Sequence, residues 1–161
     1  MRMKRLSFCA LLPIAILAPA ANTKPTVEFA VIASPDVSVS NLSIADLRKL
    51  FLGDRQFWTA KLRVALMIRA PVARERAAVV WTICKMSEAQ FAQYWIGKTM
   101  RAECTSSPLQ FTSNQQALNL VANTPGAIAI VNAAQVPAGT KVLAVEGKLP
   151  NQPGYKLQIA E

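Results

Sequence analysis

The chain has 161 residues, with 18 Lys and Arg against nine Asp and Glu, a formal net charge of +9 and no histidine. The lack of histidine excludes Ser-His-Asp and Cys-His catalytic arrangements, and no Walker loop or Gly-x-Gly-x-x-Gly segment offers a nucleotide site. The basic excess favours anionic partners, but no aromatic-basic RNA motif occurs, so we expect no nucleic acid, no metal and no cofactor.

The N-terminus has the three parts of a secretory signal. A basic start, Met1–Arg5, is followed by the uncharged apolar run Leu6–Ala20, which ends in small residues. This pattern predicts a signal peptide over residues 1–20, a mature domain over residues 21–161 and a periplasmic or secreted location. The alternative is an uncleaved membrane anchor, for which the run is shorter than the about 20 residues that a membrane span requires.

The first half of the mature chain alternates between strand and helix patterns. Thr26–Ser34 and Leu62–Ala70 are rich in β-branched and apolar residues, which predicts two buried strands. Between them, Ser43 followed by Asp46 forms a capping-box pattern, and Gly53 is placed to end the helix.

Three further helices are predicted before the last strands. One runs from Pro71 through Met86, the next begins at a Ser87 cap, and the third follows a Ser113 cap and ends before the Pro125-Gly126 turn. The second of these carries an aromatic face of Phe91, Tyr94 and Trp95. We expect that face to be core, although a ligand platform is the alternative.

The chain ends in three predicted strands. They cover Ala127–Asn132, Thr140–Gly147 and Tyr155–Ala160, and the last two are close enough in sequence to pair antiparallel. Strands that alternate with helices predict an α/β domain with a mainly parallel sheet flanked by helices.

Two cysteines remain in the predicted mature domain. Cys9 belongs to the signal peptide, which leaves Cys84 and Cys104. An even pair in a small exported domain predicts a disulfide, which would contribute about 3 kcal/mol in the chain-entropy model. A metal site is the alternative, and it would need further ligands.

The candidate ligand residues lie where strands end. In open α/β sheets, ligands bind beyond the carboxyl ends of parallel strands, where helix N-termini present N–H groups. Arg69 ends a predicted strand, Arg74 and Arg76 enter the following helix, and Ser34 is a weaker candidate at the end of the first strand. Arg74 opposes the helix dipole, a conflict that a bound anion would relieve and that Glu75 partly relieves. A solvated basic face is the alternative to an anion pocket.

Several segments occur in one fixed order that resembles the phosphate-binding-protein-like family, the substrate-binding components of phosphate transport systems. The segments are "LRKLFLGDRQFW", "LRVALMIR", "AQYW" and "VANTPGAIAIVN", and the resemblance covers Phe29–Asn132. It implies one lobe of a type II periplasmic-binding-protein-like fold. It also implies an anion-binding role for Arg69, while the family's Ser-Gly-Thr positions read Ala73, Arg74 and Glu75.

The leading hypothesis is therefore an exported, non-enzymatic, solute-binding-like domain. It would bind phosphate or another small oxyanion and serve a membrane ABC permease, and two copies could pair as a homodimer. The second hypothesis is an envelope protein-interaction module that keeps the lobe but has lost ligand binding. A minor acid/base enzyme is the third, and it would need two acids facing each other in one cleft.

Overall fold

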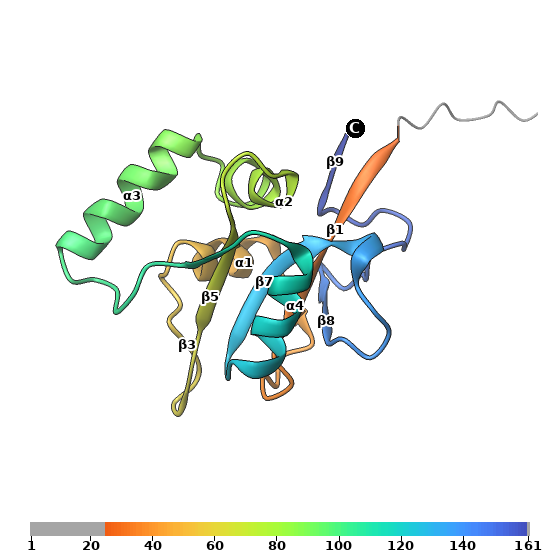
Figure 1. Ribbon diagram of the computed structural model, residues 1–161, viewed down its shortest axis with the longest axis horizontal. Helices are drawn as coiled ribbons and strands as arrows, with labels where there is room; N and C mark the ends of the chain where they lie inside the picture. The colour runs from red at the N-terminus through yellow and green to blue at the C-terminus, as the bar shows by residue number, and fades with distance from the viewer. Residues whose placement is uncertain (1–24, 161) are drawn as a thin grey trace, which may run out of the picture.

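A seven-stranded sheet organises the computed structural model, which describes residues 25–160 (Figure 1). The predicted signal peptide and Cys9 lie outside the described residues. The strands of the sheet are β1 (Thr26–Ala33), β2 (Asn41–Leu42), β5 (Ala65–Arg69), β6 (Leu109–Phe111), β7 (Ala127–Asn132), β8 (Val142–Val145) and β9 (Gln158–Ala160). Their order is β2-β8-β1-β7-β5-β6, with β9 attached to β1.

One strand of this sheet runs against all the others. β1 pairs antiparallel with β7, β8 and β9, whereas the β2–β8, β5–β6 and β5–β7 pairs are parallel. The sheet is therefore mainly parallel, as predicted, with β1 reversed near its centre. The prediction that the last two strands pair with each other is wrong, because β8 and β9 each pair with β1 instead.

Helices cover both faces of the sheet, and α1, α3 and α4 begin where the caps predicted. They are α1 (Ile44–Phe51), α2 (Arg74–Ala77), the π-helical segment η1 (Ala78–Ile83), α3 (Glu88–Met100), α4 (Asn114–Asn123) and the 3-10 turn η2 (Ala133–Gln135). Capping boxes at Ser43 and Ser87 start α1 and α3, and the side chain of Ser113 caps α4. Among residues 25–160, no helix has the length and apolarity to cross a membrane.

Two predicted elements are divided in the structure. The single helix predicted from Pro71 to Met86 is a short α2 followed directly by η1. The strand predicted over Leu62–Ala70 is interrupted at Val64, whose N–H bonds to Gln56 O. Its first part, β4 (Leu62–Arg63), pairs with β3 (Phe57–Thr59) in a separate hairpin that projects from the body of the domain (Figure 1).

Apolar residues pack against both faces of the sheet. Successive side chains of β1 point alternately to one face and to the other. Phe29, Val31 and Ala33 face a cluster that includes side chains of α1, η1 and α3, while Ala30 and Ile32 face the cluster under α4. Burial of a large apolar side chain contributes about 1.5–3 kcal/mol, so these two clusters supply the main driving force for folding. The aromatic face of α3 belongs to the first cluster, since Phe91 and Trp95 are buried there.

The predicted disulfide is not formed. Cys84 and Cys104 are both free thiols in the structure. Cys84 follows η1 and is fully buried in the core, and this burial raises the pKa of its thiol to about 12. Cys104 is half-buried in the loop after α3, where its sulfur lies 3.7 Å from Thr99 Oγ1. The even number of cysteines led to the wrong prediction of a disulfide. Cys84 is instead a small apolar residue of the core.

Candidate functional site

The carboxyl ends of β5, β6 and β7 lie together at one side of the sheet, which we call the carboxyl edge. Arg69 is the last residue of β5, as predicted, and its side chain is half-buried. Its Nη1 atom is buried without a hydrogen-bond partner, and its guanidinium carbon lies 5.9 Å from the ring centroid of Phe111. A buried cationic donor without a partner is costly, and the described residues provide no acceptor for this atom.

Arg76 is held by protein groups at the same edge. Its side chain is only 8% exposed, and its Nε donates to both carboxylate oxygens of Glu88 at 2.9 Å. Its Nη1 donates to Arg69 O at 3.1 Å. Arg76 thus joins the end of β5 to the start of α3 and fixes the backbone that carries Arg69.

Arg74 begins α2 and is exposed, and the residue before it, Ala73, provides no side-chain cap. Glu75 turns inward instead and is buried. The helix start at the family's Ser-Gly-Thr positions therefore lacks hydroxyl donors and places a carboxylate beside the edge.

An amide that sequence reasoning missed completes this cluster. Asn114, the first residue of α4, is 8% exposed, and its Nδ2 donates to Glu75 Oε1 at 2.9 Å and to Gln135 Oε1 at 2.6 Å. Its Oδ1 is buried and has no partner among the described residues. The only sequence signal for Asn114 was its place directly after the Ser113 cap, and nothing in the sequence linked it to Glu75.

Ser34 lies at the opposite edge of the sheet from Arg69. Because β1 is reversed, its carboxyl end lies beside the start of β7, where Ser34 N donates to Ala127 O. Continuing the β5–β7 register places Arg69 level with Val131, about 13 Å farther along the strands. Ser34 Oγ is buried without a partner, but it is not placed to share one small ligand with Arg69.

The Pro-Gly turn belongs to this opposite edge, which we call the amino edge, and its contacts are structural. Gly126 has φ +70°, and a Cβ on it would lie 1.9 Å from Arg63 O. Its N–H bonds the carboxylate of Asp36 at 3.2 Å, while its carbonyl accepts from Trp58 Nε1 at 2.8 Å and from Ala65 N at 3.0 Å. The turn therefore fixes the hairpin and the starts of β5 and β7.

The end of α1 is fixed in a similar way by α3. The carbonyl of Leu52 accepts from Tyr94 Oη at 3.0 Å and from the buried Lys98 Nζ at 2.9 Å. Burial alone would lower the pKa of Lys98, but hydrogen bonds with Asp54 and Tyr94 raise it above its usual value. Gly53 leaves no room for a side chain, because a Cβ there would lie 2.8 Å from the ring of Trp95.

The fold is similar to that of solved phosphate-transport proteins. Superposition on PstS from Borrelia burgdorferi gives a TM-score of 0.67 at 15% identity, covering 85% of this chain and 56% of that one. An ABC-type phosphate transport receptor from Vibrio cholerae gives 0.62 at 14% identity, covering 83% and 54%. A protein from Clostridium perfringens that was crystallised with phosphate, and assigned to phosphate ABC transport as a substrate-binding protein, gives 0.60 at 15% identity, covering 76% and 46%.

The chain shares its fold with about half of a phosphate substrate-binding protein. These matches confirm the predicted fold class and the predicted resemblance to phosphate-transport substrate-binding proteins. The chain spans 46–56% of the length of these three proteins. Neither a protein-family model nor a curated protein matches the sequence.

Proposed function

We propose that the protein is an exported, non-enzymatic solute-binding domain that binds a small phosphate-like oxyanion at the carboxyl edge. The observation that carries this proposal is the buried, unpaired Nη1 of Arg69. The guanidinium lies at the carboxyl end of a parallel strand, the usual ligand position in open α/β sheets. Its planar fork of donors suits bidentate binding of an oxyanion. The fold shared with phosphate-transport proteins supports the same class of ligand.

Within this proposal the three arginines have different roles. Arg69 contacts the anion, and Arg74, which is exposed at the start of α2, adds positive charge at the rim. Arg76 positions Arg69 by donating a hydrogen bond to the backbone carbonyl of Arg69. The Nε of Arg76 is already bonded to Glu88 and is not available to the anion. Asn114 Nδ2 already binds Glu75 and Gln135, and these bonds keep the neighbouring carboxylate in place.

The partners of this function are part of the same proposal. A solute-binding domain of this type would deliver its ligand to a membrane ABC permease. Because the chain spans about half of the phosphate-transport proteins, a second copy could provide the facing half of a cleft. Sedimentation of the domain with and without phosphate would test that pairing.

Thermal unfolding in phosphate, sulfate or molybdate tests the ligand. Each anion is added at millimolar concentration and fixed ionic strength. An anion present at 100 times its dissociation constant would stabilise the fold by about 2.7 kcal/mol and raise the midpoint. Arg69→Met should abolish the shift, whereas Arg48→Met, which removes an exposed arginine of α1, should leave it unchanged. No shift with any of the three anions would overturn the proposal.

One observation favours the second candidate, an interaction module without a ligand. At the Ser-Gly-Thr positions, Ala73 and Glu75 replace hydroxyl donors with a methyl group and a buried carboxylate, which repels anions. Large apolar side chains are also exposed, including Trp81 at 60% and Met100 at 83%. If no oxyanion binds, these exposed side chains are the first surfaces to test for protein partners.

A further inference from the structure

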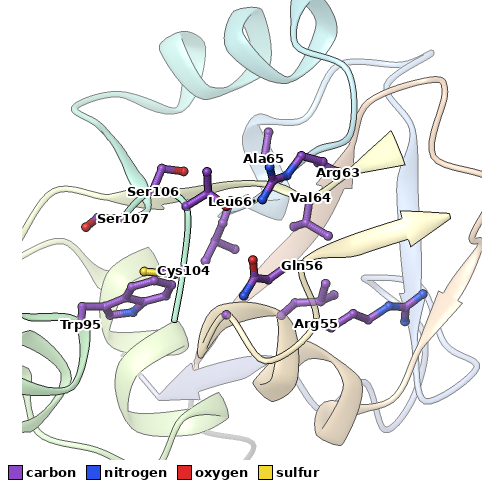
Figure 2. A pocket seen from close by; sticks show the side chains of 13 residues that line it. Arg55, Gln56, Arg63, Val64, Ala65, Leu66, Trp95, Cys104, Ser106 and Ser107 are labelled. Atoms are coloured by element: carbon purple, nitrogen blue, oxygen red, sulfur yellow. Dashed lines mark hydrogen bonds between the residues drawn. The ribbon is translucent and has the colours of Figure 1, made fainter. Parts of the chain in front are cut away.

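A cavity of about 300 Å³ lies at the amino edge (Figure 2). It borders Ala65, at the start of β5, whereas Arg69 ends this strand. Its walls come from the end of α1, the hairpin, the start of β5, α3 and the loop after α3. Arg69, Arg74 and Arg76 do not line it. The cavity is therefore separate from the site proposed above, and its size is at the lower end of the range for small-molecule sites.

The inner part of the cavity is apolar. Leu50, Leu66 and Trp95 line it, and Leu50 and Trp95 are buried in the core. Gly53 also lines it, and its missing side chain is what allows the ring of Trp95 to lie against the end of α1. Figure 2 shows Trp95 and Cys104 together at one side of the space. An apolar or aromatic group is the natural occupant of such a floor.

The rim is polar and held in place by hydrogen bonds. Gln56 Nε2 donates to Glu103 O at 2.8 Å, and Arg63 Nη2 donates to Thr105 Oγ1. Thr99 Oγ1 lies 3.3 Å from Ser107 Oγ. The first two bonds tie the loop after α3 to the hairpin segment, and the third contact ties it to α3 itself. The cavity therefore has a preformed wall rather than a loose loop.

The charge of the lining is one-sided. Its residues include Arg55 and Arg63 but no Asp or Glu. Arg63 is exposed, with its guanidinium carbon 5.0 Å from the ring centroid of Phe57. A guanidinium has five N–H donors, and one of those of Arg63 is used by Thr105, so others remain for an anion. The hydroxyl of Ser106 makes no hydrogen bond within residues 25–160 and adds a further donor.

We infer that this cavity is a second binding site, for a small organic anion with an apolar or aromatic body. The apolar part rests against Leu66 and Trp95, and the carboxylate or similar group lies at the rim beside Arg63 and Ser106. An inorganic oxyanion would leave the apolar floor unfilled, and a neutral or cationic compound would not use Arg63. The two sites of the domain thus differ in ligand class, with a small inorganic anion at one edge and an amphiphilic anion at the other.

A titration with benzoate, benzamide and benzylamine tests this inference, because the three compounds have similar bodies and different charges. Binding is followed by ¹H–¹⁵N NMR spectra of the full chain. Benzoate should bind saturably and shift the amides of Thr105–Ser107 and the indole signal of Trp95. Benzamide should bind about tenfold more weakly, because it lacks the charge-assisted bond to Arg63, and benzylamine should not bind. Equal binding of the three compounds, no saturable binding, or shifts confined to residues 69–76 would each overturn the inference.

Matched variants separate a specific contact from bulk charge. Arg63→Gln should weaken benzoate about tenfold, whereas Lys156→Gln, which removes an exposed charge next to β9, should not change it. Arg69→Met should also leave benzoate binding unchanged, so this test does not depend on the oxyanion proposal. An equal loss in Arg63→Gln and Lys156→Gln would show attraction to net charge alone and overturn the inference. Ser106→Trp, placed to obstruct the mouth from an exposed position, gives a second test if Arg63→Gln does not fold.

Discussion

The two edges of the sheet differ in the kind of polar group that they leave unpaired. At the amino edge, Gly126 donates to Asp36 and accepts from Trp58 and Ala65. At the carboxyl edge, Arg69 Nη1 and Asn114 Oδ1 are buried and unpaired. Ser34 Oγ at the amino edge is also buried and unpaired, but it belongs to a neutral hydroxyl. The carboxyl edge leaves a cationic donor unpaired, which costs more stability, and such costs are typical of binding sites.

Most of the family-like motifs have structural roles in this fold. The Pro-Gly turn, Gly53 and Tyr94 carry much of the resemblance, and each has a structural contact that explains it. They identify the fold without identifying a ligand. Of the residues in the resemblance, Arg69 and Trp95 each have a buried side-chain donor without a hydrogen bond, and Arg69 is the charged one of the two.

The largest expected effect is at the amino edge. Gly126→Ala forces an alanine to adopt φ +70° and places its Cβ 1.9 Å from Arg63 O. The left-handed conformation costs about 1–2 kcal/mol and the steric conflict about 1–3 kcal/mol more, so urea unfolding should show a total loss of about 2–5 kcal/mol.

Gly139→Ala is the matched control for this prediction. Gly139 has φ +87°, but a Cβ there meets nothing within 4 Å. Its substitution should cost only the conformational part, about 1–2 kcal/mol. Equal losses in the two variants would show that the contact with Arg63 O relaxes without cost and that the amino edge is less tightly fixed than the structure indicates.

The carboxyl edge should show an intermediate effect that depends on which arginine is removed. Arg76→Met breaks the ion pair with Glu88 and the bond to Arg69 O, and should cost about 1–3 kcal/mol. Arg69→Met removes a buried donor that bonds nothing, so the free energy of unfolding should stay the same or rise. Urea unfolding of both variants without ligand gives the comparison. A larger loss for Arg69→Met than for Arg76→Met would mean that Arg69 is structural and would remove the argument for an open binding edge.

Local signals in the sequence were enough to predict most of the fold. Caps at Ser43, Ser87 and Ser113 placed three helix starts, and the apolar run of β7 was predicted to its residue. What the sequence did not reveal depends on pairing between distant segments. The reversal of β1 is set by its partners β7, β8 and β9, and no local pattern in Thr26–Ala33 records the direction of a strand.

The candidate site shows the same limit. Arg69 could be placed at a strand end from its own segment, and the structure has it there. Ser34 was grouped with it on the assumption that all strands run in one direction, which the reversal of β1 makes invalid. The Glu75–Asn114 bond joins residues 39 positions apart, and the roles of Arg76 and Glu88 follow from the packing of α3, so neither could be read from spacing.

The smallest expected effect separates the two capping boxes by their response to pH. In α1, the Ser43 hydroxyl donates to Asp46 Oδ2 at 2.7 Å, and this bond, with a second from the Ser43 backbone, lowers the pKa of Asp46. In α3 the corresponding residue is the neutral Gln90, which accepts from Ser87 N at 2.9 Å. Ser43→Ala and Ser87→Ala should each cost about 1 kcal/mol at pH 7.

Only the first of these costs should depend on pH. The pKa of Asp46 is lower in the folded than in the unfolded state, so its bonds stabilise the fold above the unfolded pKa and are lost as pH falls through the folded pKa. The difference between the wild type and Ser43→Ala should therefore shrink as acid protonates Asp46, while the difference for Ser87→Ala stays constant. Urea unfolding of the three proteins between pH 7 and about pH 3 measures both differences. Parallel changes in the two variants would show that the acid response comes from elsewhere in the domain, since Asp46 is the ionisable member of these two boxes.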